Sequence, residues 1–236
     1  MHITVLNGST KVTNDQAAEM TAAVSHQVHT HVAPAWALGG RVSVSFHATP
    51  PKTPPANVLT IVDAITDEPA GVLGYHTEDT KGTQFGVVAA GPVLDAGKQV
   101  LTGDWSVASI LSHEVIEWLA DPACNLWAFD GTARFYPYEA CDPCEAPTYL
   151  VDGVSVSNFV LPAWFDTQAK PGTERDHLGL IPGAFQLLPG GYAVYVSAGR
   201  EHQVYGDQFP AWRKAMKAGP AARTRRRIVQ GSSLGF

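Results

Sequence analysis

The sequence predicts an α+β fold in which a mixed β-sheet leads into a helix with ionisable residues, followed by a loop-rich C-terminal lobe. The first half of the chain alternates short apolar, β-branched segments with two helical patterns. The second half is rich in glycine, proline and aromatic residues. A chain of 236 residues with 45% hydrophobic content can bury a full core. We expect an α/β lobe over residues 1–122, a loop-rich lobe over 123–212 and a basic tail over 213–236.

The first two elements are a strand and a helix. Residues 3–6 read Ile-Thr-Val-Leu and predict an early strand. Residues 14–31 predict a helix, with Asn14 as its cap. Its apolar stripe at helical spacing consists of Ala17, Met20, Val24 and Val28.

Four further segments read as strands. Residues 42–46 alternate apolar side chains with serines, the pattern of a half-buried strand. Residues 58–65 are mostly apolar and β-branched, which predicts a central strand. Residues 71–75 and 85–94 predict two more. The last of these contains Pro92, which cannot donate a backbone hydrogen bond, so we expect it at the edge of the sheet.

Several classes of protein are excluded by composition. The chain has no run of about 18 apolar residues, so no transmembrane helix is expected. The N-terminus lacks a basic segment followed by an apolar run, so it is not read as a signal peptide. Three cysteines argue against a disulfide framework and for a reducing compartment. We expect a cytoplasmic or virion-associated protein.

The net charge of −6 conceals an asymmetry between the body and the C-terminus. Seven of the 16 basic residues lie between Arg213 and Arg227, and no acidic residue follows Asp207. The remaining nine basic residues face all 22 acidic ones, which gives the body a charge of −13. Such a body does not favour nucleic acid. We expect the tail to dock on an acidic surface of a second copy or a partner protein, with a solvated tail as the alternative.

The chemistry is concentrated on a helix predicted over residues 104–120, which stops at Asp121-Pro122. At about 100° per residue, His113, Glu114, Glu117 and Asp121 share a polar face. His113 and Glu117 are four residues apart, so their side chains can converge on one metal ion. Glu114 lies one step round the helix, where it can act as catalytic base toward a water on that ion. The opposite, buried face consists of Val107, Leu111, Val115, Trp118 and Leu119.

The alternative interpretation of this helix is an ordinary solvated polar face. Such a face normally pairs its acids with Lys or Arg one turn away. Here no Lys or Arg occurs between Lys98 and Arg134. Carboxylates without basic partners repel one another, and a divalent cation would relieve that repulsion. The lack of basic residues therefore favours a metal site.

The segment His113-Glu114-Val115-Ile116-Glu117 resembles the His-Glu-x-x-His helix of the zincin metallopeptidases, with Glu117 in place of the second histidine. The resemblance covers roughly the first 150 residues and implies a zincin-like mixed sheet, with a substrate-aligning edge strand that leads into the metal-binding helix. The wider segments around residues 111–122 and 139–143 are similar to uncharacterised phage and bacterial proteins. The resemblance implies zinc as the ion, although a carboxylate at position 117 also suits harder divalent ions.

A catalytic ion needs about three protein ligands. The zincins supply the third from further along the chain, which directs attention to residues 138–145. Asp142 is the preferred third ligand, because an Asp-Pro turn holds a short carboxylate rigidly, and Glu139 is the next candidate. A solvated acidic loop is the alternative interpretation of this segment.

Other polar residues offer secondary candidates. His177 and Tyr192 are candidates for polarising a substrate carbonyl, although each also reads as an ordinary structural residue. Cys141 and Cys144 form a CxxC motif with Cys124 upstream, which permits a structural zinc site. Small buried thiols are the commoner outcome for such residues.

Two functions follow from these observations. The first is a metal-dependent hydrolase, a zincin-like peptidase that uses a metal-activated water and acts on a peptide or protein. The second is a zincin-like structural or assembly protein, for instance of a phage particle, that has lost catalysis. An enzyme must keep an open coordination position beside Glu114, whereas a scaffold need not.

Overall fold

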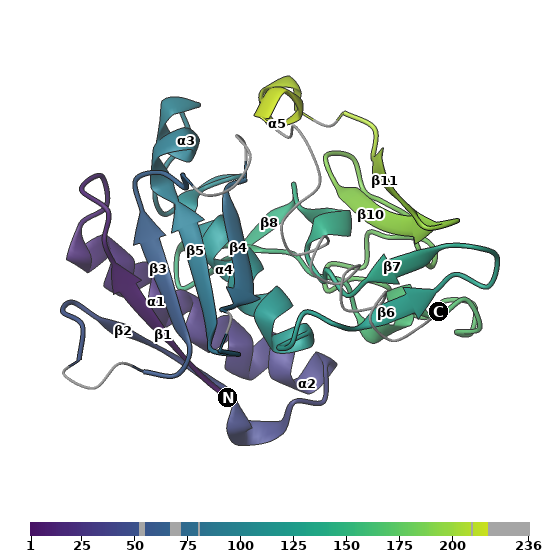
Figure 1. The fold of residues 1–236 in the computed structure, drawn as a ribbon, viewed down its shortest axis with the longest axis horizontal. Coiled ribbons are helices and arrows are strands. Elements are labelled where there is room, and N and C mark those ends of the chain that lie inside the picture. Colours follow the sequence, from purple (N-terminus) through teal and green to yellow (C-terminus); the bar gives the residue numbers. More distant parts are fainter. Residues whose placement is uncertain (52–54, 67–71, 80, 209, 217–236) are drawn as a thin grey trace.

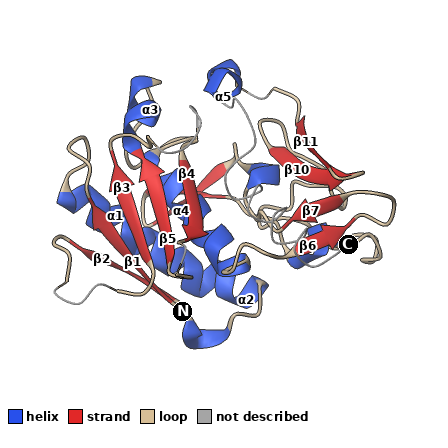
Figure 2. Cartoon of the chain, viewed as in Figure 1, coloured by secondary structure: helices blue, strands red, loops and turns tan. Residues whose placement is uncertain are grey.

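The chain folds as an α+β protein with three β-sheets, as the sequence predicts at this level (Figures 1 and 2). The structure is a computed structural model and describes residues 1–51, 55–66, 72–79, 81–208 and 210–216. The first lobe contains the larger sheet with its helices, and the second lobe consists mainly of strands and loops. None of the helices in these ranges has the length and apolar content to cross a bilayer.

The first lobe is built on a five-stranded mixed sheet with the order β2-β1-β3-β5-β4. Its strands are β1 (His2–Asn7), β2 (Ser43–His47), β3 (Val58–Val62), β4 (Gly74–Glu78) and β5 (Gln84–Ala89). All neighbours pair in parallel except β4, which runs antiparallel to β5. The predicted central strand at 58–65 is therefore confirmed as β3.

The prediction of an edge strand at 85–94 is wrong. That segment forms β5, which lies between β3 and β4, and the edge position belongs to β4. The chain then turns into helix α3 (Ala90–Asp95), so Pro92 lies in a first helical turn, where no backbone N–H is needed. Gly91 permits this turn, since a Cβ there would lie 2.2 Å from the carbonyl oxygen of Asp63.

Helix α1 (Asn14–Gln27) begins at Thr13 rather than at the predicted Asn14 cap. The Thr13 hydroxyl accepts from the Gln16 N–H, and the Gln16 side chain accepts from the Thr13 N–H, a reciprocal capping box. The helix continues as a π-helical turn, η1 (Val28–Val32), and a short helix α2 (Ala33–Ala35). The segment predicted as a single helix over 14–31 is thus an α-helix followed by a π-helical turn.

Helix α4 (Val107–Ala120) lies beside α1 on one face of the five-stranded sheet (Figure 1). Ser106 caps it by accepting from the Ser109 N–H. All 14 of its residues are buried, including those of the polar face. Trp118 joins the core of the first lobe, whereas Ile116 joins that of the second. The polar face is therefore enclosed between the two lobes.

The second lobe contains an antiparallel sheet with the order β11-β10-β7-β6 and a separate hairpin, β8-β9. Its elements are β6 (Trp127–Phe129), β7 (Phe135–Pro137), η3 (Asp142–Cys144), β8 (Thr148–Val151), β9 (Val154–Ser157), η4 (Pro162–Phe165), β10 (Tyr192–Ser197) and β11 (Arg200–Tyr205). A short 3-10 turn, η2 (Gly39–Arg41), precedes β2, and helix α5 (Ala211–Met216) follows β11.

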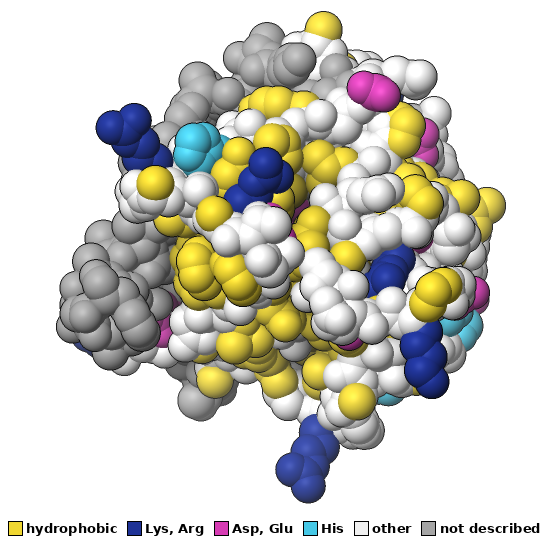
Figure 3. All heavy atoms as spheres, turned by 90° about the vertical axis from the view of Figure 1, so that its right-hand side faces the viewer, with side chains coloured by type: hydrophobic (Ala, Val, Ile, Leu, Met, Phe, Trp, Pro, Cys, Tyr) yellow, Lys and Arg dark blue, Asp and Glu magenta, His cyan; other side chains and the backbone are white. Residues whose placement is uncertain are grey.

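Hydrophobic side chains gather on the outer face of the second lobe (Figure 3). Leu126, Phe129 and Phe135 are 43%, 49% and 48% exposed. The rings of Phe129 and Phe135 lie 5.0 Å apart across β6 and β7, and β6 is the edge strand of its sheet. Clustered exposed aromatic residues of this kind are typical of a contact surface.

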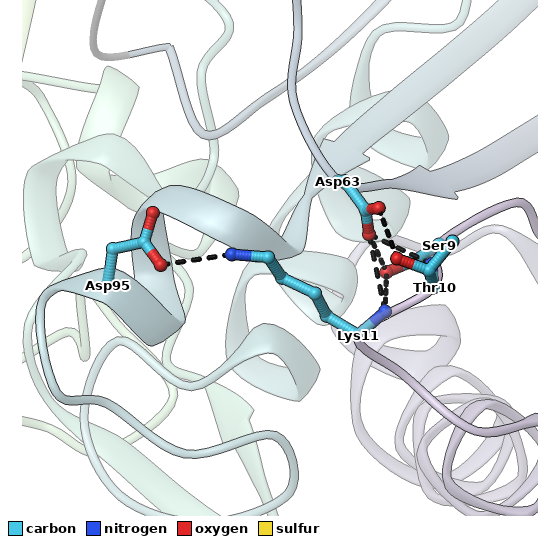
Figure 4. A network of polar contacts seen from close by, with 5 residues as sticks. All are labelled: Ser9, Thr10, Lys11, Asp63 and Asp95. Carbon is cyan, nitrogen blue, oxygen red and sulfur yellow. Dashed lines mark hydrogen bonds and ion pairs between the residues drawn. The ribbon is translucent and has the colours of Figure 1, made fainter.

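A polar network ties together the loops that follow β1 and β3 (Figure 4). The Asp63 carboxylate accepts hydrogen bonds from the hydroxyls of Ser9 and Thr10 and from the N–H groups of Thr10 and Lys11, at 2.9 and 3.3 Å for the last two. Lys11 Nζ in turn lies 3.0 Å from Asp95 of α3. The network fixes the carboxyl ends of two parallel strands and the C-terminal end of α3.

These hydrogen bonds, first those from Ser9 and Thr10, lower the pKa of Asp63 from 3.8 to about 2. The folded-state pKa is depressed, so the contribution of Asp63 to stability is complete above pH 3.8 and is lost as the pH falls toward 2. We expect carboxyl-carbon NMR to show Asp63 titrating near pH 2. A Ser9→Ala, Thr10→Val double variant should bring the titration back toward 3.8. An unchanged midpoint in that variant would show that these hydroxyls do not lower the pKa.

Candidate metal centre

A buried hydrogen-bond network fixes α4 next to its ionisable residues. Ser112 Oγ donates to Oε1 of Gln27 on α1 at 2.6 Å and accepts from the N–H of Ser157 on β9 at 3.0 Å. Gln27 Nε2 donates to the carbonyl oxygen of Ser157 at 2.9 Å. The three residues close a ring between α1, α4 and β9. Ser112 directly precedes His113, so its hydrogen bonds to α1 and β9 also fix the position of His113.

The structure brings together three of the predicted ligands, His113, Glu117 and Asp142, which we call the first ligand group. Their donor atoms lie within 4.8 Å of one another, and all three residues are buried. His113 Nε2 lies 3.3 Å from Glu117 Oε1 and 3.3 Å from Asp142 Oδ1. Asp142 comes from η3, the Asp-Pro turn of the second lobe. The group therefore spans the junction of the two lobes.

Backbone geometry orients the two carboxylates of this group. Glu117 Oε1 accepts from the N–H of Cys141 at 3.2 Å, which ties α4 to the residue before Asp142. Asp142 Oδ1 is buried, and His113 Nε2 faces it at 3.3 Å. A buried carboxylate oxygen needs a cation or a proton to compensate its charge. This oxygen is the best-placed metal ligand in the group.

Two opposing effects act on the pKa of His113. Burial alone would lower it, but the carboxylates of Glu117, Asp142 and Glu114 outweigh burial and raise the pKa well above 6.5. His113 is therefore held as an imidazolium in the absence of an ion. A divalent cation would replace this proton as the counter-charge of the carboxylates.

The structure also assembles a second ligand group, His76, Glu114 and Glu117. Their donor atoms lie within 4.8 Å of one another, and all three side chains are buried. His76 belongs to the edge strand β4, and its Nδ1 lies 3.7 Å from Glu114 Oε2. Its Nε2 faces the carbonyl oxygen of Asp121 at 3.4 Å, and its ring stacks on Trp118. Glu117 belongs to both groups, so the two share one carboxylate.

His76 is a site residue that the sequence does not predict. A single histidine in a short strand carries no motif, and it reaches α4 only because β4 turns back antiparallel to β5. Its nearest sequence signal is Gly74, two residues earlier on the same strand. A Cβ at position 74 would lie 2.7 Å from both Cγ and Oε1 of Glu114. Glycine at this position lets the β4 backbone lie against the predicted base.

The other predicted candidates divide into those at the site and those away from it. Glu139 is buried but belongs to neither ligand group. Tyr192 lies near the carboxylates of the site. Burial and the charges of Asp142, Glu145 and Glu117 raise the pKa of Tyr192 well above 10.0. Its phenol therefore stays protonated and can donate. His177 lies elsewhere, stacked on Phe159 with ring centroids 5.0 Å apart.

The three cysteines are buried free thiols. Burial, aided by the carboxylates of Glu117 and Asp176, raises the pKa of Cys141 and Cys144 well above 9.0, so both stay neutral. Neither ligand group found among the described residues contains a cysteine. The structure thus gives no support to a structural zinc site at the CxxC motif.

The start of the predicted basic tail belongs to the folded body. Arg213 lies in α5, is only 3% exposed and forms an ion pair with Glu145, which directly follows η3. Its guanidinium lies 5.0 Å from the ring of Trp105 and 5.9 Å from that of Trp212. Residues 217–236, which include the cluster of four arginines, lie outside the described residues. The predicted docking of the tail therefore stays a prediction.

Comparisons with models of known protein families, with characterised proteins and with solved structures found no match to this chain. The function proposed below is therefore based on the residues of the two ligand groups.

Proposed function

We propose that the protein is a divalent-metal-dependent hydrolase, in which the first ligand group holds the ion and Glu114 acts as the base. The observation that carries the proposal is the buried convergence of His113, Glu117 and Asp142 from two lobes. One imidazole and two carboxylates suit zinc, and also harder divalent ions. A bound ion would lower the pKa of a water and polarise a substrate carbonyl.

The residues around the group have distinct tasks in this proposal. Glu114 faces the same side of α4 as Glu117, and their carboxylate oxygens lie within 4.8 Å of each other. Glu114 is therefore within reach of a water beside the first group and can accept its proton. The protonated phenol of Tyr192 can donate a hydrogen bond to negative charge that develops on the substrate. The edge strand β4, with Gly74 against Glu114, supports the resemblance to the zincin arrangement of an edge strand beside a metal-binding helix.

The experiment measures the metal content and peptidase activity of the purified full chain. We expect one tightly bound divalent ion per chain and cleavage within an unbiased peptide library. Glu114→Gln should retain this ion and lose activity by a factor on the order of 10² or more, because the amide cannot accept the proton. Glu139→Gln is the matched control, since Glu139 is buried but outside both groups.

Each result bears on one part of the proposal. Wild type purified without chelators but free of metal would contradict it at the first step. Equal activity in wild type and Glu114→Gln would remove Glu114 from the reaction. Loss of the tightly bound ion from Glu114→Gln would make Glu114 a ligand of the first ion rather than a base.

The second candidate function is a non-catalytic assembly protein on the same scaffold. The observation that favours it is the exposed pair Phe129 and Phe135 on the edge hairpin of the second lobe. An assembly protein would retain the ion as a structural link between its lobes and show no cleavage of the library. The same experiment therefore separates the two functions.

A further inference from the structure

We propose that the second ligand group, His76, Glu114 and Glu117, is a cation site of its own, which takes a second divalent ion and thereby withdraws Glu114 from catalysis. This inference rests on the proposed function, since it assumes that the first ligand group holds the catalytic ion. It assigns a role to His76.

The geometry of the second ligand group meets the needs of a divalent ion. One imidazole nitrogen and two carboxylates lie within 4.8 Å of one another. Glu114 and Glu117 lie one turn apart on α4, and His76 comes from β4, which packs against that helix. Both elements are regular and buried, so the donors are held in place before an ion arrives. Preorganised ligands of this kind favour binding.

The surroundings hold His76 and Glu114 toward each other. The His76 ring stacks on Trp118 at a centroid distance of 5.8 Å and an angle of 11°, which fixes the plane of the imidazole. Its Nε2 faces the Asp121 carbonyl at 3.4 Å, so Nδ1 is the nitrogen turned toward Glu114. On the far side, Gly74 leaves room for the Glu114 carboxylate, where a Cβ would come within 2.7 Å.

The charge balance leaves room for a second cation. After an ion has bound to the first group, Glu114 still contributes a buried negative charge and Glu117 is shared. A carboxylate has two oxygens, so Glu117 can contact one ion with each. Repulsion between two neighbouring divalent ions must make the second bind more weakly than the first. We therefore expect sequential binding, with the first group filled first, because His113 Nε2 lies 3.3 Å from both carboxylates of that group, whereas His76 Nδ1 lies 3.7 Å from Glu114.

Binding at the second group has a functional consequence. A carboxylate that coordinates a cation is a poor proton acceptor, because the cation stabilises its ionised form. Glu114 would then no longer take the proton from water. Excess divalent ion should inhibit the enzyme, and His76 should set the concentration at which inhibition begins. Without a second ion, His76 would instead serve only as a buried partner of Glu114.

The test is equilibrium dialysis of the full chain against buffered Zn²⁺ of rising free concentration, with metal and protein measured in the same sample. We expect wild type to pass from one to two ions per chain. His76→Phe keeps a ring against Trp118 but has no nitrogen ligand, and His76→Gln keeps a polar side chain. Both variants should retain the first ion. Each should bind the second ion at least about tenfold more weakly than wild type, because removal of even an outer-shell partner lowers metal affinity by about that much. His177→Phe is the matched control, a ring-stacked histidine outside both groups, and should bind two ions like wild type.

The outcomes separate this inference from the proposed function. No ion at any zinc concentration would overturn the proposed function itself. One ion in wild type throughout the titration would overturn the second site and leave the proposed function standing. A second ion that binds wild type and both His76 variants at the same free zinc concentration would place that ion elsewhere on the chain and also overturn the inference. A second ion that binds both variants at least about tenfold more weakly than wild type would support it.

Discussion

Replacing His113 by alanine is expected to remove the tightly bound ion from the protein. His113 supplies the one imidazole of the first ligand group, and its Nε2 lies 3.3 Å from both carboxylates of that group. The loss should exceed the roughly 10–100-fold weakening caused by removal of an outer-shell partner. Binding to wild type should also weaken as the pH is lowered, because the raised pKa of His113 means that an ion must displace its proton.

The burial of the site determines which variants are needed. His113 lies between buried carboxylates, so His113→Ala removes their counter-charge and can destabilise the fold as well as the site. Asp142→Asn is the gentler second variant, since it keeps the shape of the side chain and removes one charged ligand. His177→Ala is the control outside both groups. Ion content is measured by elemental analysis and folding by circular dichroism. A folded His113→Ala and a folded Asp142→Asn that both retain wild-type ion content would contradict the assignment of the first group.

The juxtaposition of His113 and Glu117 on α4 could be predicted because its geometry is local. His113 and Glu117 are four residues apart, and helical periodicity alone places them on one face. Asp142 was chosen because it is a carboxylate in a rigid turn without basic neighbours, and the structure does place it at His113. Such arguments need no knowledge of how the sheets pair.

Features that depend on pairing and packing could not be predicted. His76 reaches Glu114 only because β4 is the antiparallel edge strand, an order of strands that no local pattern encodes. Pro92 favours an edge strand in the sequence, but a proline is equally compatible with the first turn of a helix. The polar face of α4 was expected to point away from the core. Its burial follows from the second lobe, whose residues Tyr136 and Trp164 form a core together with Ile116.

The largest effect on stability is expected from Arg213→Ala. Arg213 is 3% exposed, forms an ion pair with Glu145, and its guanidinium lies 5.0 Å from the ring of Trp105 and 5.9 Å from that of Trp212. Removal of one partner of a buried pair leaves the other charge uncompensated, which costs about 3–5 kcal/mol. The stacked rings add about 0.5–2 kcal/mol of cation–π energy to what is lost. Arg213 is the first residue of the basic tail predicted over 213–236, so its contribution to the folded body could not be predicted from the sequence.

The measurement is urea unfolding of wild type, Arg213→Ala and the double variant Arg213→Met, Glu145→Gln. The double variant removes both charges and keeps most of the buried volume, so it should recover much of the loss. Arg200→Ala, at an exposed position on β11, is the control and should change the free energy of unfolding by less than about 0.5 kcal/mol. The effect of Arg213→Ala should also vary little with salt, because a buried pair is poorly screened. A loss as small as that of Arg200→Ala would mean that α5 does not hold the chain together through Arg213. Trp105 directly precedes the Ser106 cap of α4, and Glu145 directly follows η3. A loss of the expected size would therefore show that Arg213 of α5, through its contacts with both residues, connects the two elements that carry the first ligand group.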